Sequence, residues 1–195
     1  MARIPPLSID DLAADIRPAI EAGEAMLGFL SDDALIMARN PPLLRGVLQM
    51  VQAVYAPGRV DPALKRLVGL MVSAAAGCQY CTAHTAWSAE RLGVDAAKLA
   101  ALWEYETSDA FSAAERAALN VARSAAQAPG GVTDELYGAL REHFDTAEQI
   151  EIVAVIAMFG FLNRWNATLA TDIEAAPAAR AAAMGLIDQG AAAAD

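Results

Sequence analysis

The stretch LKRLVGLMVSAAAGCQYCTAHT, residues 64–85, contains the end of one predicted helix and the start of the next. Gly77 can adopt the positive φ of a helix C-terminal cap, so we expect the second helix to begin near Cys78. Positions three or four apart share one face of a helix, which places Cys78, Cys81 and His84 in one stripe. Both cysteines of the chain and one of its two histidines are therefore predicted to lie together.

The start of a helix favours thiolate chemistry at this stripe. The first turn presents unpaired backbone N–H groups and the positive end of the helix dipole, which favour the thiolate form of Cys78. Cys-X-X-Cys pairs in such surroundings can have thiol pKa values well below the free value of about 8.5. His84, one turn beyond Cys81, is close enough to exchange a proton with it. We interpret the pair as a dithiol that cycles to a disulfide, because a four-residue bridge constrains the chain too little to be structural.

Two alternatives stay open for the cysteines. Two thiolates and an imidazole can bind zinc with His143 or water as the fourth ligand, although structural zinc sites usually draw their ligands from two separated pairs. His143 is better explained as a helix-terminal cation beside Glu142. Free cysteines can also pack as small apolar side chains in a protein without catalytic activity.

The rest of the chain has the periodicity of helices and no convincing strand, which predicts an all-α fold. Capping boxes at Ser112 with Glu115 and at Asp145 with Glu148 mark two helix starts. Residues 150–162 are apolar on nearly every side, so we expect their helix to be buried among its neighbours. The predicted helices cover residues 42–55, 62–76, 78–92, 95–104, 112–127, 133–143 and 146–171.

Composition restricts the classes of function. The net charge is -10, with 14 Lys and Arg against 24 Asp and Glu, so the surface is unsuited to nucleic-acid phosphates. The N-terminus lacks the basic start and apolar run of a secretory signal. The apolar run over residues 152–162 is shorter than the roughly 20 residues that span a bilayer. We expect a cytoplasmic protein that binds neither nucleic acid nor membrane, with a subunit interface among its many apolar residues.

Three parts are predicted along the chain. Residues 1–39 form an N-terminal helical segment that packs on the core, and residues 40–174 form the main domain. Residues 175–195 form an alanine-rich C-terminal tail that contains Pro177 and Gly185. We expect this tail to hold at most one loosely attached helix.

Residues 64–73 and 77–85 resemble the carboxymuconolactone decarboxylase superfamily, in its alkylhydroperoxidase D-like, peroxidase-related branch. The resemblance extends through residues 161–166 and covers about residues 40–174. It implies an all-α helical bundle with the Cys-X-X-Cys motif at the start of a core helix. It also implies assembly as a homo-oligomer, commonly a trimer or hexamer.

The same resemblance implies a reaction and its participants. The substrate is a hydroperoxide: Cys81 attacks the O–O bond, Cys78 resolves the resulting sulfenic acid to a disulfide, and His84 carries a proton. A dithiol reductant, either a protein or a small molecule, then restores the two thiols. Our own interpretation of the site involves no bound organic cofactor and no metal.

The sequence departs from the alkylhydroperoxidase D pattern at three positions. Arg66 stands where that enzyme has the glutamate of its proton relay, and arginine cannot accept a proton, although its charge can lower a thiol pKa. Two residues separate Cys81 from His84, where that enzyme has three, and one helical position turns a side chain by about 100°. Tyr80 replaces a histidine, and we interpret it mainly as a packing residue.

Further candidates come from the end of the long helix and from the roles of the thiols. The resemblance suggests that Trp165 and Asn166 line the pocket, although packing explains them as well. The helix dipole favours Cys78 as the thiolate whereas the resemblance assigns the attack to Cys81, so both assignments stay open.

Lactone decarboxylation is poorly supported, because the decarboxylase branch as a rule lacks this cysteine pair. The predicted function is hydroperoxide reduction, with a non-catalytic or metal-binding oligomer as the alternative.

Overall fold

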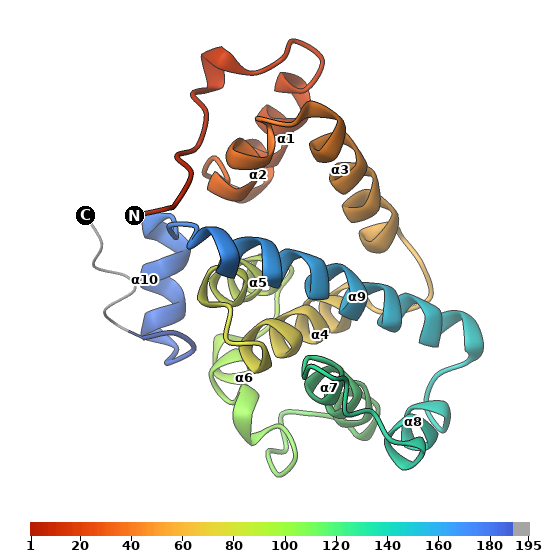
Figure 1. The fold of residues 1–195 in the computed structure, drawn as a ribbon. Coiled ribbons are helices and arrows are strands. Elements are labelled where there is room, and N and C mark those ends of the chain that lie inside the picture. Colours follow the sequence, from red (N-terminus) through yellow and green to blue (C-terminus); the bar gives the residue numbers. More distant parts are fainter. Residues whose placement is uncertain (189–195) are drawn as a thin grey trace.

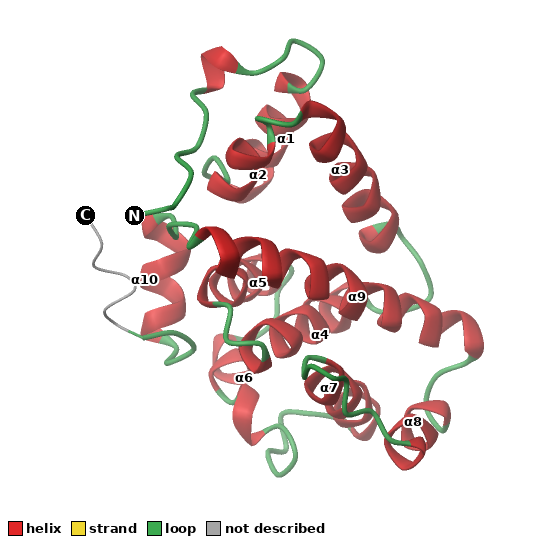
Figure 2. Cartoon of the chain, in the orientation of Figure 1, coloured by secondary structure: helices red, strands yellow, loops and turns green. Residues whose placement is uncertain are grey.

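The computed structural model describes residues 1–188, and over that range the chain is helical with no strand (Figure 1 and Figure 2). The predicted all-α fold is therefore confirmed. The elements are η1 (Ile9–Asp11), α1 (Arg17–Leu27), α2 (Asp32–Met37), α3 (Pro41–Tyr55), α4 (Pro62–Ala75), α5 (Gln79–Arg91), α6 (Ala96–Ala100), η2 (Leu102–Glu104), α7 (Ala113–Ala125), α8 (Asp134–Arg141), α9 (Thr146–Leu169) and α10 (Ala175–Ala183).

Local capping signals set the helix starts. Both predicted capping boxes are present, at Ser112 before α7 and at Asp145 before α9. The side chains of Asn40 and Asp61 cap α3 and α4, each ahead of a proline in the first turn. The helix predicted over residues 95–104 is divided into α6 and η2.

The core is built around α4 and α5, which follow one another through Gly77 at φ +71°. The long helix α9 packs against both of them, and α7 packs against α4 (Figure 1). Val68, Leu70 and Met71 of α4 are fully buried in this cluster. The start of α5, where the cysteines lie, is consequently held between several helices.

The N-terminal helices α1 and α2 form a second cluster with α3, which lies at the top of Figure 1. Ile16, Ile20 and Leu44 are buried in this cluster, and Leu162 and Trp165 of α9 pack against it. One side of α9 thus contacts both apolar clusters, and α9 forms part of the boundary between them.

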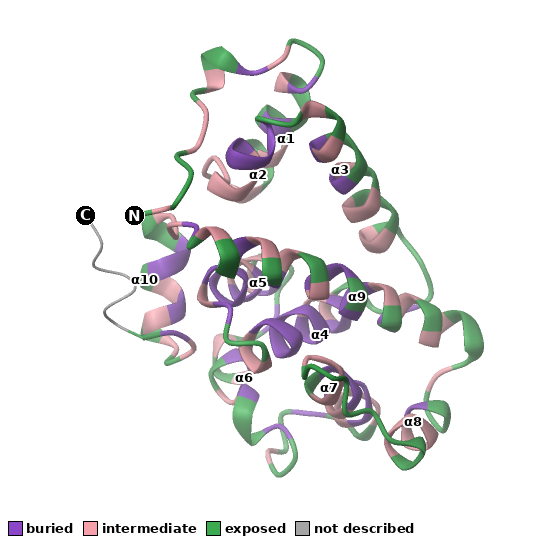
Figure 3. Ribbon diagram, in the orientation of Figure 1, coloured by how far each residue is buried: buried purple, intermediate pink, exposed green. Residues whose placement is uncertain are grey.

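The expectation that residues 150–162 are buried on all sides is wrong. Ile152 and Val155 of α9 are fully buried, whereas Ile150 is 64% exposed and both Val153 and Phe161 are 37% exposed. Buried and exposed positions alternate along the ribbon of α9 (Figure 3). By length and composition alone α9 would also suit a membrane span, and its inner side packs against α3, α4 and α5. The exposed residues form an apolar stripe along its outer side.

The C-terminal helix is more firmly packed than the sequence predicted. α10 packs against α5, with Ala178 and Ala181 buried, and Arg180 forms an ion pair with Glu90. The expectation of a loosely attached helix is wrong, because small alanine side chains allow a close approach to α5. The last part of the predicted tail, residues 189–195, lies outside the described residues.

Candidate active site

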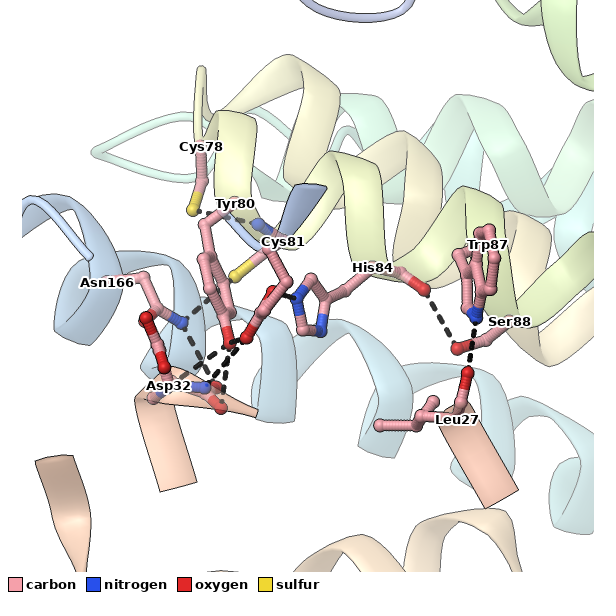
Figure 4. A network of polar contacts seen from close by, with 11 residues as sticks. Leu27, Asp32, Cys78, Tyr80, Cys81, His84, Trp87, Ser88 and Asn166 are labelled. Carbon is pink, nitrogen blue, oxygen red and sulfur yellow. Dashed lines mark hydrogen bonds and ion pairs between the residues drawn. The ribbon is translucent and has the colours of Figure 1, made fainter. Parts of the chain in front are cut away.

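Both cysteines lie at the start of α5, and both are buried (Figure 4). Cys78 is the N-cap residue, and its Sγ accepts a hydrogen bond from the backbone N–H of Cys81 at 3.4 Å. The positive φ of Gly77 turns the chain directly before Cys78. This turn places the first sulfur at the positive end of the α5 dipole.

The two thiols differ in acidity. A hydrogen bond with Cys81 lowers the pKa of Cys78 below its ordinary value, although burial opposes the shift. The same hydrogen bond, together with burial, raises the pKa of Cys81 well above its ordinary value. Of the two thiols Cys78 is therefore the more acidic, in the direction that its position at the helix start predicted.

Asn166 of α9 connects the thiols to α2. Its Nδ2 donates to Cys81 Sγ at 3.4 Å and to Asp33 Oδ2 at 3.4 Å (Figure 4). The side chain is buried, so these contacts are made away from bulk water. The predicted pocket candidate Asn166 thus lies at the cysteine pair.

The Tyr80 hydroxyl lies between two carboxylates. It is 3.1 Å from Asp33 Oδ1 and 3.1 Å from Glu174 Oε1, and it accepts a hydrogen bond from the backbone N–H of Asp33. A hydroxyl has one proton, so it can donate to only one of the two carboxylates at a time. The interpretation of Tyr80 as mainly a packing residue is therefore wrong.

His84 pairs with Glu174, and the structure shows no hydrogen bond between His84 and Cys81. Its Nε2 is 2.5 Å from Glu174 Oε2, and its ring stacks on Tyr80 with centroids 4.1 Å apart. Burial acts to raise the pKa of Glu174, but the hydrogen bond and charge of His84 bring it below its ordinary value. A direct proton exchange between His84 and Cys81 stays a prediction.

Three carboxylates close to the thiols were missed by sequence reasoning: Asp32 and Asp33 of α2, and Glu174 just before α10. Burial, followed by the charge of Glu174, raises the pKa of Asp32 to about 6. Burial also raises the pKa of Asp33 above its ordinary value, partly offset by the charge of His84. No motif marks these residues, because they lie far from the cysteines in sequence and reach them only through packing.

A cavity of about 230 Å³ opens onto Cys81 and His84. Its lining is mainly apolar and comes from α1, α2, α3 and α9 as well as from α4 and α5. The apolar walls include Ile20, Met37, Val47, Met158, Phe159 and Leu162. An apolar cavity with a few converging polar groups is the usual form of a small-molecule site.

Arg66 lines this cavity as well, on the side formed by α4. Its guanidinium carbon lies 3.5 Å from the centroid of the Tyr55 ring. The main causes of the thiol pKa shifts are the other thiol, burial, Asn166 and Asp33, and Arg66 is not among them. Arg66 thus belongs to the cavity, and its charge does not explain the acidity of Cys78.

Trp165 is not brought to the cysteines. Its ring packs against the N-terminal cluster and lies near Phe161, with ring centroids 6.3 Å apart. It lines a separate hollow beside Arg164, away from the cavity at Cys81. The expectation that Trp165 lines the reactive pocket is therefore wrong, and the packing explanation fits its surroundings.

The zinc alternative has no ligand set in the part of the chain that the structure describes. Within residues 1–188 no group of three or more His, Cys, Asp or Glu side chains is arranged to hold a metal ion. His143 follows the last turn of α8 and is exposed. The predicted ligand His143 thus adds nothing to the cysteine pair.

The described residues form an all-helical fold with a buried Cys-X-X-Cys pair at the start of α5. The family model described as the carboxymuconolactone decarboxylase family matches residues 41–124. The chain is 34% identical over 111 residues to the uncharacterized protein YnjA of Escherichia coli K12, which is 56% of this chain. That match spans 60% of the length of YnjA.

Two solved structures have a similar fold. The debrominase Bmp8 is 36% identical with a TM-score of 0.87, covering 93% of this chain and 97% of Bmp8. The AhpD core of a peroxidase-related protein from Ralstonia eutropha JMP134 is 24% identical with a TM-score of 0.80, covering 89% of this chain and 92% of that one. Residues 41–124 thus match the carboxymuconolactone decarboxylase family, and the chain has the fold of the AhpD core.

Proposed function

We propose that the protein is a thiol-dependent oxidoreductase that reduces hydroperoxides through a Cys78/Cys81 dithiol–disulfide cycle. One observation carries the proposal: the backbone N–H of Cys81 donates to Cys78 Sγ, and Cys81 also lines the apolar cavity that His84 shares. A substrate in this cavity meets one sulfur while the second is already beside the first. The reaction converts one hydroperoxide and two thiols into one alcohol, one water molecule and one disulfide.

The two thiols take different parts in this proposal. Cys81 lines the substrate cavity, and the neighbouring Cys78 sulfur can accept its proton as it attacks. Attack by Cys81 breaks the O–O bond, forms a sulfenic acid and releases the alkoxide, which leaves as the alcohol once protonated. Cys78 then attacks the sulfenic sulfur and expels hydroxide, which a proton converts to water. His84, oriented by Glu174, is placed at the cavity to transfer these protons.

Stopped-flow mixing of the reduced protein with hydrogen peroxide and with cumene hydroperoxide tests the proposal. The wild type should lose two thiols per hydroperoxide consumed. Cys78→Ser should stop at a sulfenic acid that dimedone traps, and Cys81→Ser should react far more slowly. If Cys81→Ser consumes hydroperoxide as quickly as the wild type, Cys81 is not the attacking thiol. Stoichiometric zinc that blocks both thiols in the purified protein would favour the metal-binding alternative.

Reductive dehalogenation is a second candidate, favoured by the 36% identity to a debrominase over 97% of its chain. A cysteine-to-alanine variant of Bmp8 has been solved in complex with 2,3,4-tribromopyrrole. The same dithiol could replace a carbon–bromine bond by carbon–hydrogen, releasing bromide and a proton as the disulfide forms. One bromide released from this pyrrole per disulfide would support dehalogenation. Hydroperoxide consumption without bromide release would support the leading proposal.

The proposed cycle also needs partners. A dithiol reductant, protein or small molecule, must restore the thiols after each turnover, because the reaction leaves a disulfide. We further propose that a second copy of the chain covers the exposed apolar stripe of α9, which includes Ile150, Val153 and Phe161. Assembly as a trimer or hexamer would remove this stripe from water.

A further inference from the structure

Arg66 lacks the partners that a largely enclosed cation normally has. Its guanidinium stacks on the Tyr55 ring at 3.5 Å, a contact that occupies one face of the planar group. Its Nε is buried and has no hydrogen-bond partner among the described residues. No described carboxylate forms a salt bridge with it. The edge of the guanidinium that could bind an anion is therefore available.

Lys65, the residue before Arg66, is a buried cation, but its ammonium group has partners. Lys65 is 3% exposed, and its Nζ donates to the carbonyl oxygens of Val54 and Ala56 at 3.0 and 3.3 Å. It also forms an ion pair with Glu151 at 2.9 Å. Lys65 and Arg66 are adjacent on α4, yet only the one that lines the cavity lacks an ionic partner among the described residues.

The other charged groups of the cavity do not compensate Arg66. Asp33 is engaged by Tyr80 and Asn166, and His84 is engaged by Glu174. Glu24 also lines the cavity, but it lies on α1, is exposed, and forms no salt bridge with Arg66. The remaining walls are mainly apolar, and an unpaired charge in such surroundings is unfavourable.

A second unpartnered donor lies beside the guanidinium. The Tyr55 hydroxyl is buried, and its proton has no acceptor among the described residues, because the neighbouring Arg66 guanidinium can only donate to it. Tyr55 lines the same cavity as Arg66 and Cys81. A phenolic hydroxyl and a guanidinium together can donate to a carboxylate, whereas neither can be satisfied by an uncharged apolar molecule.

We propose that this cavity binds a small, mainly apolar molecule that carries one carboxylate, with the carboxylate on Arg66 and the Tyr55 hydroxyl. The apolar body then contacts Phe159 and Leu162 within the cavity that Cys81 lines. For turnover this inference rests on the proposed function. The substrate class is then an organic hydroperoxide that carries a carboxylate. Binding of the carboxylate itself does not depend on thiol chemistry.

Calorimetric titration with 4-tert-butylbenzoate and with 4-tert-butylbenzamide tests the binding step. These probes share the same apolar body and differ in charge. The wild type should bind the carboxylate about tenfold more tightly than the amide, as a charge-assisted hydrogen bond to arginine predicts. Arg66→Gln should abolish this preference while leaving the affinity for the amide within about twofold, because the walls are unchanged. Equal affinities in the wild type, or no binding of the carboxylate, would overturn the proposal.

Two further variants keep the result interpretable. Tyr55→Phe retains the ring under the guanidinium and removes only the hydroxyl, so it should weaken the carboxylate severalfold even if Arg66→Gln fails to fold. Glu24→Gln removes a charge of opposite sign from the cavity lining and should not weaken the carboxylate. A preference for the carboxylate that is unchanged in Tyr55→Phe and in a folded Arg66→Gln would contradict the proposal.

The same titration with Cys81→Ser separates this inference from the proposed function. That variant lacks the proposed attacking thiol but retains Arg66 and Tyr55, so it should bind the carboxylate with wild-type affinity. If the protein reacts with no hydroperoxide but still prefers the carboxylate, only the proposed function is contradicted. Normal hydroperoxide chemistry with no preference for the carboxylate would remove the inference alone.

Discussion

Glu174 Oε2 lies 2.5 Å from His84 Nε2, which joins the residue before α10 to the middle of α5 across 90 positions of sequence. The other oxygen of this carboxylate is within 3.1 Å of the Tyr80 hydroxyl and accepts the backbone N–H of Asp32 at 2.7 Å. The resemblance implies a glutamate on the helix before the cysteines, where this chain has Arg66. In this chain the carboxylate at the site is Glu174, which comes from the C-terminal part.

Substitution of Glu174 by glutamine should slow the reaction of the dithiol with hydroperoxide. Glutamine keeps the size of the side chain but removes the charge that orients His84 and supports proton transfer. We expect the second-order rate constant to fall about a hundredfold, the scale of a general acid–base contribution. Stopped-flow rates measured across the neutral pH range should also show a changed pH profile.

Asp172→Asn is the matched control for this variant. Asp172 lies two residues earlier and bonds with the N-terminal amine and the backbone N–H of Ala2, so its loss leaves the Glu174–His84 contact intact. The control should react at close to the wild-type rate. Equal slowing of both variants, or no slowing of Glu174→Gln, would count against a role for this carboxylate in proton transfer.

The parts of the molecule that sequence predicted are those set by local signals. The capping boxes at Ser112 and Asp145 each involve residues three positions apart, and both are present in the structure. The placement of Glu174 depends on packing between α10 and α5, a long-range event that no short pattern encodes. Apolar residues occur on nearly every side of α9. The sequence alone therefore could not show which of them face the core and which form the exposed stripe.

The raised pKa of Asp32 makes stability depend on pH. Below about pH 4 this carboxyl is protonated in both the folded and the unfolded chain. The folded protein holds this proton more tightly than the unfolded chain does, so the protonated carboxyl stabilises the fold at low pH. This contribution to the free energy of unfolding is lost as the pH rises through about 6. Asp32→Asn should therefore have a higher Tm than the wild type at pH 7, by about 2–4 °C, and the difference should vanish near pH 4.

Asp15→Asn provides a control of opposite sign. A hydrogen bond from Arg45 lowers the pKa of Asp15, so its contribution is present above about pH 4 and is lost as the pH falls. This variant should be slightly less stable than the wild type at neutral pH. Thermal unfolding followed by circular dichroism from about pH 2 to about pH 8 measures both effects. A stability gain in Asp32→Asn that did not vary with pH would refute the titration of Asp32 as its cause.

The apolar stripe of α9 should set the assembly state. Phe161→Glu places a charge on this exposed stripe, where it would be buried if a second copy covers the helix. Sedimentation equilibrium should give a wild-type mass of several times the 20.4 kDa chain and a smaller assembly for the variant. Glu135→Gln, at an exposed position of α8 away from this stripe, is the charge-changing control and should sediment as the wild type does. A wild type that sediments as a single chain would remove the proposed interface.

Two glycines at helix interiors should respond oppositely to alanine. Gly46 of α3 is exposed and an added Cβ would meet nothing within 4 Å, so Gly46→Ala should stabilise the protein by about 0.5–1 kcal/mol. Gly69 of α4 is buried, and its added Cβ would lie 2.5 Å from Cε2 of Phe159. Gly69→Ala should destabilise by about 1–3 kcal/mol, the usual cost of overpacking. Urea unfolding of both variants measures the difference.

The Gly69 substitution also tests the cavity, because the Phe159 ring that must move is one of its walls. Displacement of this ring changes the space available to a bulky substrate more than the space needed by hydrogen peroxide. The ratio of the rate constants for cumene hydroperoxide and hydrogen peroxide should therefore change severalfold in Gly69→Ala and stay constant in Gly46→Ala. The ratio is insensitive to partial unfolding, since loss of active protein scales both rates equally. A constant ratio in Gly69→Ala would mean that bulky hydroperoxides do not reach Cys81 past Phe159.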